Sequence, residues 1–87
     1  MNILVTGGAR GIGAGIVTEL AKQGHSVAFC GRAAAETCAE RLKALRSEYP
    51  GKFEYYQCDI SCHEDRERLL DSFSADFGGL DMLVNNA

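Results

Sequence analysis

The sequence predicts an α/β fold, a doubly wound parallel sheet with helices on both faces. Short aliphatic runs alternate with longer amphipathic stretches in the order βαβαβαβ. The connections are long enough for helical crossovers, and parallel strands cannot be joined by hairpin turns. Because such crossovers are right-handed, we expect the spatial strand order 3-2-1-4, with the first strand inside the sheet.

The first half of the chain predicts two buried strands with a helix between them. Residues 2–6 and residues 26–30 are short runs rich in aliphatic side chains. Between them, apolar residues recur at the spacing of one helix face, and Gly24 is a typical stop after the last turn. The expected apolar face comprises Ile12, Ile16, Val17, Leu20 and Ala21.

The second half repeats the alternation. A second helix is expected over residues 34–48, with Cys38, Leu42 and Leu45 on its apolar face. A third strand follows over residues 53–58, and its polar Glu54 and Gln57 favour a position at the sheet edge.

The third helix has the clearest end signals. Ser61 and Glu64 have the spacing of a capping box, and Gly78-Gly79 is a stop signal. The expected apolar face comprises Leu69, Leu70, Phe73 and Phe77. A fourth strand is expected over residues 81–84.

Composition excludes several classes of protein. Eighty-seven residues with 46% hydrophobic and 24% charged side chains suit one small globular domain, not a disordered chain, a collagen or a membrane span. With no secretion signal, a cytoplasmic location is expected. The net charge is −3 and the basic residues are scattered, which argues against nucleic-acid binding. The four cysteines are expected to be reduced, small hydrophobic residues, and Cys58, Cys62 and His63 lack the further ligands that a metal site needs.

Four glycines lie within residues 7–13, between the first strand and the first helix. Without a Cβ the backbone can adopt positive φ and approach a phosphate, whose charge then meets free N–H groups and the helix dipole. The segment also lies at the carboxyl end of a central strand, where ligands bind in such sheets. We therefore expect a diphosphate site, the alternative being a tight turn that packs the helix closely on the strand.

The spacing of the glycines narrows the class of nucleotide-binding protein. A strict G-x-G-x-x-G is absent because Ile16 stands at the third position, and the pattern is instead Thr6-Gly7-x-x-x-Gly11-Ile12-Gly13. Cys58-Asp59-Ile60 follows the third strand, and Asn85-Asn86-Ala87 follows the fourth. On these motifs the whole chain resembles the amino-terminal, cofactor-binding part of a classical short-chain dehydrogenase/reductase, of the 3-oxoacyl-ACP-reductase-like kind.

The resemblance implies a Rossmann-type fold and a set of cofactor-binding residues. The pyrophosphate and adenosine ribose would lie against Gly7, Gly8, Ala9, Arg10, Gly11, Ile12 and Gly13, with Ile12 offering its backbone N–H. Asp59 would bond the adenine amino group, Ile60 would lie against the ring, and Asn85 and Asn86 would line the path to the nicotinamide. Alternatively, Asp59 is stabilised by the dipole of the next helix, and the two asparagines are turn residues.

The end of the second strand bears on which dinucleotide binds. An NAD enzyme usually has an acid there for the ribose hydroxyl, whereas a 2′-phosphate favours arginine. Here Gly31 takes the place of the acid and Arg32 follows, while Arg10 lies in the glycine segment. We therefore expect NADP(H) in preference to NAD(H). The alternative is that both arginines are solvated surface charges.

The catalytic serine, tyrosine and lysine of such enzymes are not found here. Tyr49 and Lys52 are three residues apart, which is not Y-x-x-x-K. We therefore expect residues 1–87 to be the amino-terminal part of one NAD(P)-binding domain, inactive alone and marginally stable, with an apolar fourth strand exposed. The complete protein is expected to be a homo-oligomer acting on a small carbonyl or alcohol.

Two other functions compete with this reading. One is a nucleotide-binding module without catalysis. The other is an S-adenosylmethionine-dependent methyltransferase, because Gly11-x-Gly13-x-Gly15 fits its G-x-G-x-G loop. That class needs an acid after the second strand, where Gly31-Arg32 stands, so it ranks last.

Overall fold

The computed structural model describes residues 1–86, so Ala87, the last residue of the expected Asn-Asn-Ala motif, lies outside the described residues. The elements are β1 (Asn2–Thr6), α1 (Gly11–Lys22), β2 (Ser26–Gly31), the 3₁₀ helix η1 (Ala35–Cys38), α2 (Ala39–Glu48), β3 (Phe53–Gln57), α3 (His63–Phe77) and β4 (Met82–Asn85). Their order confirms the expected alternation.

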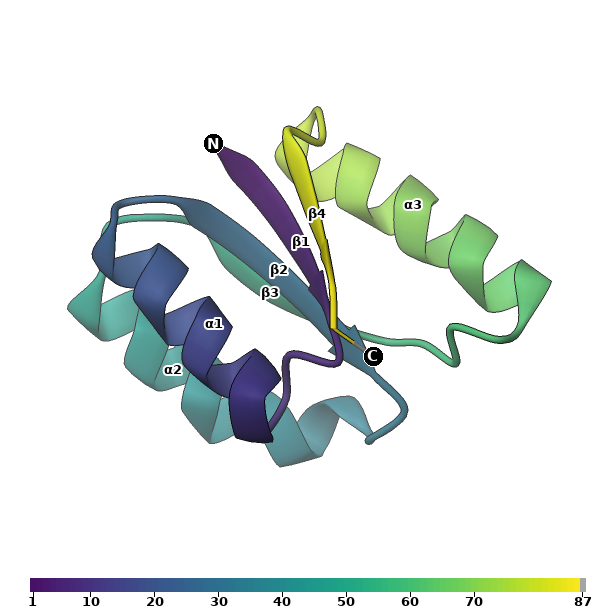
Figure 1. Ribbon diagram of the computed structural model, residues 1–87, viewed down its shortest axis with the longest axis horizontal. Coiled ribbons are helices and arrows are strands. Elements are labelled where there is room, and N and C mark those ends of the chain that lie inside the picture. Colours follow the sequence, from purple (N-terminus) through teal and green to yellow (C-terminus); the bar gives the residue numbers. More distant parts are fainter. Residues whose placement is uncertain (87) are drawn as a thin grey trace.

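The four strands form one parallel sheet in the order β3-β2-β1-β4, as predicted. Helices α1 and α2 cover one face and α3 covers the other (Figure 1). Each face has its own core. Phe29 and Phe53 lie in the core beneath α1 and α2, whereas Leu69 and Phe73 of α3 pack on Leu4 and its neighbours.

Several sequence expectations were wrong in detail. The second helix begins as a 3₁₀ turn, and only residues from Ala39 onward are α-helical. Leu70 is 52% exposed and Ile12 is 79% exposed, so neither belongs to a buried helix face. Leu69 and Phe73 form the stripe of α3 that meets the sheet. A side chain beside that stripe is left in solvent because no second described helix flanks α3 on this face.

The capping box is also absent. Helix α3 has Cys62 as its N-cap, without a side-chain cap bond. The Ser61 hydroxyl instead donates to Asp59 Oδ1 at 2.7 Å, and the Ser61 N–H donates to the same oxygen at 3.0 Å. A carboxylate two residues earlier in the chain therefore outcompetes the helix for this serine, as local turns often do.

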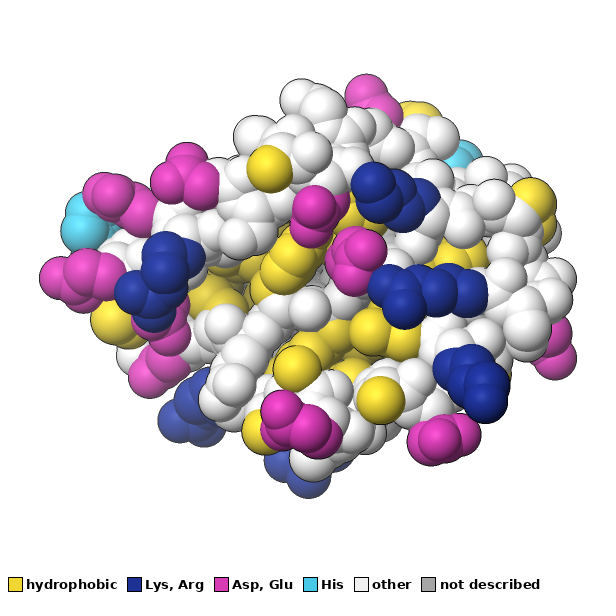
Figure 2. Space-filling model, turned by 180° about the vertical axis from the view of Figure 1, so that it is seen from behind, with side chains coloured by type: hydrophobic (Ala, Val, Ile, Leu, Met, Phe, Trp, Pro, Cys, Tyr) yellow, Lys and Arg dark blue, Asp and Glu magenta, His cyan; other side chains and the backbone are white. Residues whose placement is uncertain are grey.

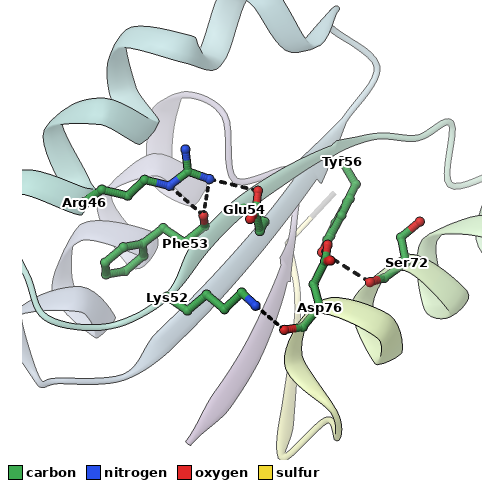
Figure 3. A network of polar contacts seen from close by, with 7 residues as sticks. All are labelled: Arg46, Lys52, Phe53, Glu54, Tyr56, Ser72 and Asp76. Carbon is green, nitrogen blue, oxygen red and sulfur yellow. Dashed lines mark hydrogen bonds and ion pairs between the residues drawn. The ribbon is translucent and has the colours of Figure 1, made fainter.

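The two edges of the sheet differ. Strand β3 is an edge strand, as its polar residues predicted, and its Phe53 carbonyl accepts hydrogen bonds from the Arg46 guanidinium, which also pairs with Glu54 at 2.9 Å (Figure 3). Strand β4 forms the other edge, where Met82 is 41% and Leu83 55% exposed. This exposure agrees with the expected apolar fourth strand. The marginal stability inferred from it stays a prediction.

The surface carries charges of both signs. On the face drawn in Figure 2, both Lys or Arg and Asp or Glu side chains lie around a hollowed middle that exposes apolar side chains. Within residues 1–86, no helix has the length and apolar character needed to cross a membrane. The described part of the chain also contains no group of three or more His, Cys, Asp or Glu side chains placed to hold a metal ion.

Candidate functional site: a cavity at the carboxyl ends of β1, β2 and β3

The main cavity, about 930 Å³ in volume, lies where β1, β2 and β3 end. Residues from all three strand ends and from the segments that follow them line it. Among the predicted site residues, the lining includes Gly7, Ala9, Arg10, Arg32, Asp59 and Ile60. The other predicted residues, Gly8, Gly11, Ile12, Gly13, Asn85 and Asn86, lie outside this lining. The fold thus brings half of the predicted set together at the cavity.

The glycine loop after β1 depends on close backbone packing. A Cβ on Gly13 would lie 2.0 Å from the carbonyl oxygen of Gly7, and a Cβ on Gly8 would lie 2.5 Å from Cβ of Phe29. Gly7 and Gly11 adopt positive φ angles of 69° and 63°. The packing alternative considered for these glycines therefore describes Gly8 and Gly13 well. It is compatible with phosphate binding, because packing α1 tightly on the loop brings the helix N-terminus to the site.

The N-terminus of α1 presents unsatisfied donors. The first N–H groups of a helix have no intrahelical partner. Here the N-cap residue Arg10 is extended and gives no side-chain cap bond, and no acidic side chain lies in the first turn. The backbone N–H groups of Gly11, Ile12 and Gly13 are therefore suited to an anion, and the helix dipole adds to their effect.

The two asparagines at the end of β4, Asn85 within the strand and Asn86 after it, hold the glycine loop in place. Thr6 Oγ1 donates to Asn85 Oδ1 at 3.1 Å and accepts from the Asn86 N–H at 3.0 Å. Asn86 Nδ2 donates to the Gly7 carbonyl at 3.2 Å. These contacts connect the ends of β1 and β4 directly. They give both asparagines a positioning role, whatever they contribute to a ligand.

Charges of both signs meet at the cavity. Arg10 and Arg32 line it from the segments after β1 and β2, and Asp59 lines it from the segment after β3. Hydrogen bonds from Ser61 lower the pKa of Asp59, and the Arg32 charge lowers it further. Asp59 is thus a preoriented carboxylate that accepts hydrogen bonds within its own turn.

Three thiols form an apolar part of the lining. Cys30, Cys38 and Cys58 are buried and face the cavity. Burial and, secondarily, the neighbouring Cys58 raise the pKa of Cys30 to about 11. Burial also raises the pKa of Cys58. Cys30 and Cys58 are therefore neutral at physiological pH. The burial of all three cysteines confirms their interpretation as small hydrophobic residues.

Sequence reasoning missed several contributors to this site. Thr6 belongs to the glycine motif, yet its bridging of β1 and β4 follows only from the pairing of those strands. The spacing of Ser61 and Glu64 predicts a helix cap, but Ser61 instead orients Asp59. Cys30 and Cys58 carried a usable signal, because each stands at the end of a strand of a predicted parallel sheet.

Comparison with known proteins agrees with this architecture. Residues 1–87 match the family model described as short chain dehydrogenase. The L-fucose dehydrogenase of Bos taurus is 40% identical over 85 residues, which cover 98% of this chain and 29% of that protein. The chain therefore spans about a third or less of such a relative's length.

Solved structures give the same result. The NADH-dependent reductase A1-R′ complexed with NAD is 34% identical, with a TM-score of 0.88, covering 99% of this chain and 35% of that one. An alcohol dehydrogenase from Thermococcus sibiricus complexed with 5-hydroxy-NADP is 27% identical, with a TM-score of 0.87, covering 94% and 34%. From its glycine motif, its sheet order and these matches along its entire length, the chain belongs to the short-chain dehydrogenase family.

Proposed function

We propose that this chain is the amino-terminal, dinucleotide-binding part of an NADP(H)-dependent oxidoreductase. The complete protein would transfer hydride between the nicotinamide and the carbonyl or alcohol carbon of a small molecule. One observation carries the proposal: an uncapped helix N-terminus adjoins a cavity that is lined by two arginines at the carboxyl ends of parallel strands.

The residues of the cavity fit such a cofactor. The pyrophosphate would take the N–H groups at the start of α1, which Gly8 and Gly13 allow to lie close to β1. Asp59 would accept from the adenine amino group, and Ile60, which is 37% exposed, would cover the ring. Asn85 and Asn86 would line the path toward the nicotinamide. When bound, the cofactor supplies or accepts the hydride, and this chain's residues bind and orient it.

The preference for NADP(H) rests on the segment after β2. Gly31 presents no carboxylate to repel a 2′-phosphate, and Arg32 lines the cavity directly after it. Arg10 lines the same cavity from the glycine loop. Two guanidinium groups would neutralise a phosphate dianion through charge-assisted hydrogen bonds.

Calorimetric titration of the full-length protein with NADPH, NADH and S-adenosylmethionine tests the proposal. We expect NADPH to bind most tightly, NADH more weakly by about tenfold or more, which is the effect of one charge-assisted contact, and S-adenosylmethionine not to bind. Equal affinity for NADPH and NADH would refute the cofactor preference. Binding of S-adenosylmethionine alone would favour the methyltransferase reading.

A second measurement separates an enzyme from a binding module. NADPH oxidation by the full-length protein is followed with a panel of small aldehydes and ketones. Turnover supports the oxidoreductase, and tight NADPH binding without turnover on any of them supports the module. The small-molecule substrate, the homo-oligomeric state and the cytoplasmic location stay predictions.

A further inference from the structure

The segment that carries Arg32 is fastened to the edge strand β3. The Tyr55 hydroxyl donates to the carbonyl oxygen of Ala33 at 2.7 Å. Gln57 Nε2 donates to the carbonyl oxygen of Arg32 at 3.2 Å. Gln57 also pairs in register with Gly31. Two side chains of β3 therefore hold consecutive peptide groups of the loop after β2.

Tyr55 is a rigid donor. Tyr55 is 7% exposed, and its ring lies against that of Phe29 with the ring centroids 5.3 Å apart. Burial raises the pKa of its hydroxyl above the ordinary value, so the hydroxyl keeps its proton and donates throughout the physiological pH range. A buried aromatic side chain has little conformational freedom, so the Ala33 carbonyl is held at a fixed place.

Gly31 makes room for this hydroxyl. A Cβ added at Gly31 would lie 3.3 Å from the hydroxyl oxygen of Tyr55, closer than an ordinary van der Waals contact. Position 31 is also where an acid would stand in an NAD-binding protein. The absence of a side chain at position 31 thus leaves space for the Tyr55 hydroxyl beside the end of β2.

We propose that Tyr55 is a positioning residue for cofactor choice: it holds the loop after β2 so that Arg32 meets the 2′-phosphate of NADP(H). The inference rests on the proposed function. Tyr55 lies outside the cavity lining and acts through the loop backbone, with Gln57 as a second fastening.

The chain offers a matched control in the next residue. Tyr56 belongs to the opposite face of the sheet, where its hydroxyl donates to Asp76 of α3 at 2.5 Å (Figure 3). It has no contact with the loop after β2 among its hydrogen bonds. Tyr56→Phe therefore removes a hydroxyl from the same strand without touching the proposed fastening.

The experiment compares two probes that differ only in the 2′-phosphate, adenosine 2′,5′-bisphosphate and 5′-AMP. Their dissociation constants are measured by calorimetry on the full-length protein and on Tyr55→Phe, Gln57→Met, Tyr56→Phe, Arg32→Ala and the double variant Tyr55→Phe/Arg32→Ala. We expect Tyr55→Phe to lower the preference for the bisphosphate about three- to tenfold, the effect of one hydrogen bond. Tyr56→Phe should leave it unchanged, and the double variant should match Arg32→Ala.

Each outcome bears on a different claim. If the parent protein shows no preference, or Arg32→Ala leaves it unchanged, the proposed 2′-phosphate contact fails and this inference fails with it. If Arg32→Ala abolishes the preference but Tyr55→Phe does not change it, the role of Tyr55 alone is overturned. If Tyr55→Phe does not fold, Gln57→Met decides, because Gln57 is exposed and its loss should lower the preference in the same direction.

Discussion

Two loops border the cavity, and they are built by different means. The glycine loop after β1 depends on backbone packing, since a Cβ on Gly13 would lie 2.0 Å from the Gly7 carbonyl oxygen. The loop after β2 depends on side chains, with Arg32 at the cavity and Tyr55 holding the neighbouring carbonyl. The first loop should therefore tolerate almost no change and accept any dinucleotide, whereas the second can be altered to change which dinucleotide binds.

The largest expected effect is at the glycine loop after β1. Gly13→Ala places a methyl group against a carbonyl of the main chain, which cannot move aside without disturbing β1. We expect the free energy of unfolding of the full-length protein to fall by about 3 kcal/mol or more, with loss of both NADPH and NADH binding. Urea denaturation and calorimetry measure the two effects.

Gly15→Ala is the matched control for this change. Gly15 lies on the same helix with no atom within 4 Å of the added Cβ. Alanine should stabilise the helix by about 0.5–1 kcal/mol relative to glycine. Equal destabilisation by both substitutions would mean that the loop does not depend on close packing at Gly13.

The next largest effect is at the loop after β2, which carries Arg32. Arg32→Asp places a carboxylate beside the proposed 2′-phosphate, so the NADPH dissociation constant should rise at least about tenfold while that of NADH changes little. Calorimetric titrations measure both. Lys43→Asp makes the same change in net charge on an exposed position of α2 outside the cavity lining and should alter neither constant. An unchanged preference in Arg32→Asp would show that Arg32 does not contact the phosphate.

A smaller effect concerns Cys30, a buried residue near the end of β2 that lines the cavity. The Cys30 carbonyl accepts from the Gly7 N–H at 2.9 Å, and its thiol has a pKa of about 11, so only about 0.1% is thiolate at pH 8. Iodoacetamide should therefore modify Cys30 on the order of a hundredfold more slowly than an ordinary thiol. Mass spectrometry should detect modification of the less buried Cys62 first. Equally fast modification of Cys30 and Cys62 would mean that the Cys30 thiol is open to solvent.

The same thiol predicts a direction for alkaline stability. The folded-state pKa lies above the ordinary value of 9.0, so between pH 9 and about 11 the unfolded chain loses this proton before the folded chain does. The contribution is complete below pH 9 and is lost as the pH rises toward 11. Cys30→Ala should therefore flatten the fall in the free energy of unfolding over that range, as measured by urea titrations at several pH values.

The smallest effect is at the turn after β3. Ser61→Ala removes the hydroxyl that donates to Asp59, so the pKa of the Asp59 carboxyl should rise toward its ordinary value. Carbon-detected NMR titration of the side-chain carboxyl measures this shift. Because the Ser61 N–H still holds the carboxylate, NADPH affinity should change little. An unchanged Asp59 pKa would mean that the hydroxyl is not its main stabilising partner.

Most of the architecture was predictable from the sequence because its signals are periodic and local. Alternating apolar runs and glycine stops predicted the four strands, and the right-handedness of crossovers predicted their order. The polar Glu54 and Gln57 predicted the edge position of β3. The exposure of Leu70 was not predictable, because it depends on whether a neighbouring helix covers that side of α3. The prediction of a capping box at Ser61 was wrong because a capping box and a turn onto Asp59 use the same hydroxyl.

The site was predictable in part for the same reason. Glycine spacing and strand ends indicated where Arg10, Arg32 and Asp59 gather. The hold of Tyr55 on Ala33 joins residues 22 positions apart and follows only from the register of β2 and β3. No local pattern around Tyr55 distinguishes it from Tyr56, although the pleat of the strand directs them to opposite faces.

A crystal structure of the full-length protein with NADPH tests the central claim most directly. We predict the pyrophosphate on the N–H groups of Gly11 to Gly13 and the 2′-phosphate within hydrogen-bonding distance of the Arg32 guanidinium. Electron density for NADPH elsewhere, or a 2′-phosphate directed into solvent away from both arginines, would contradict the account.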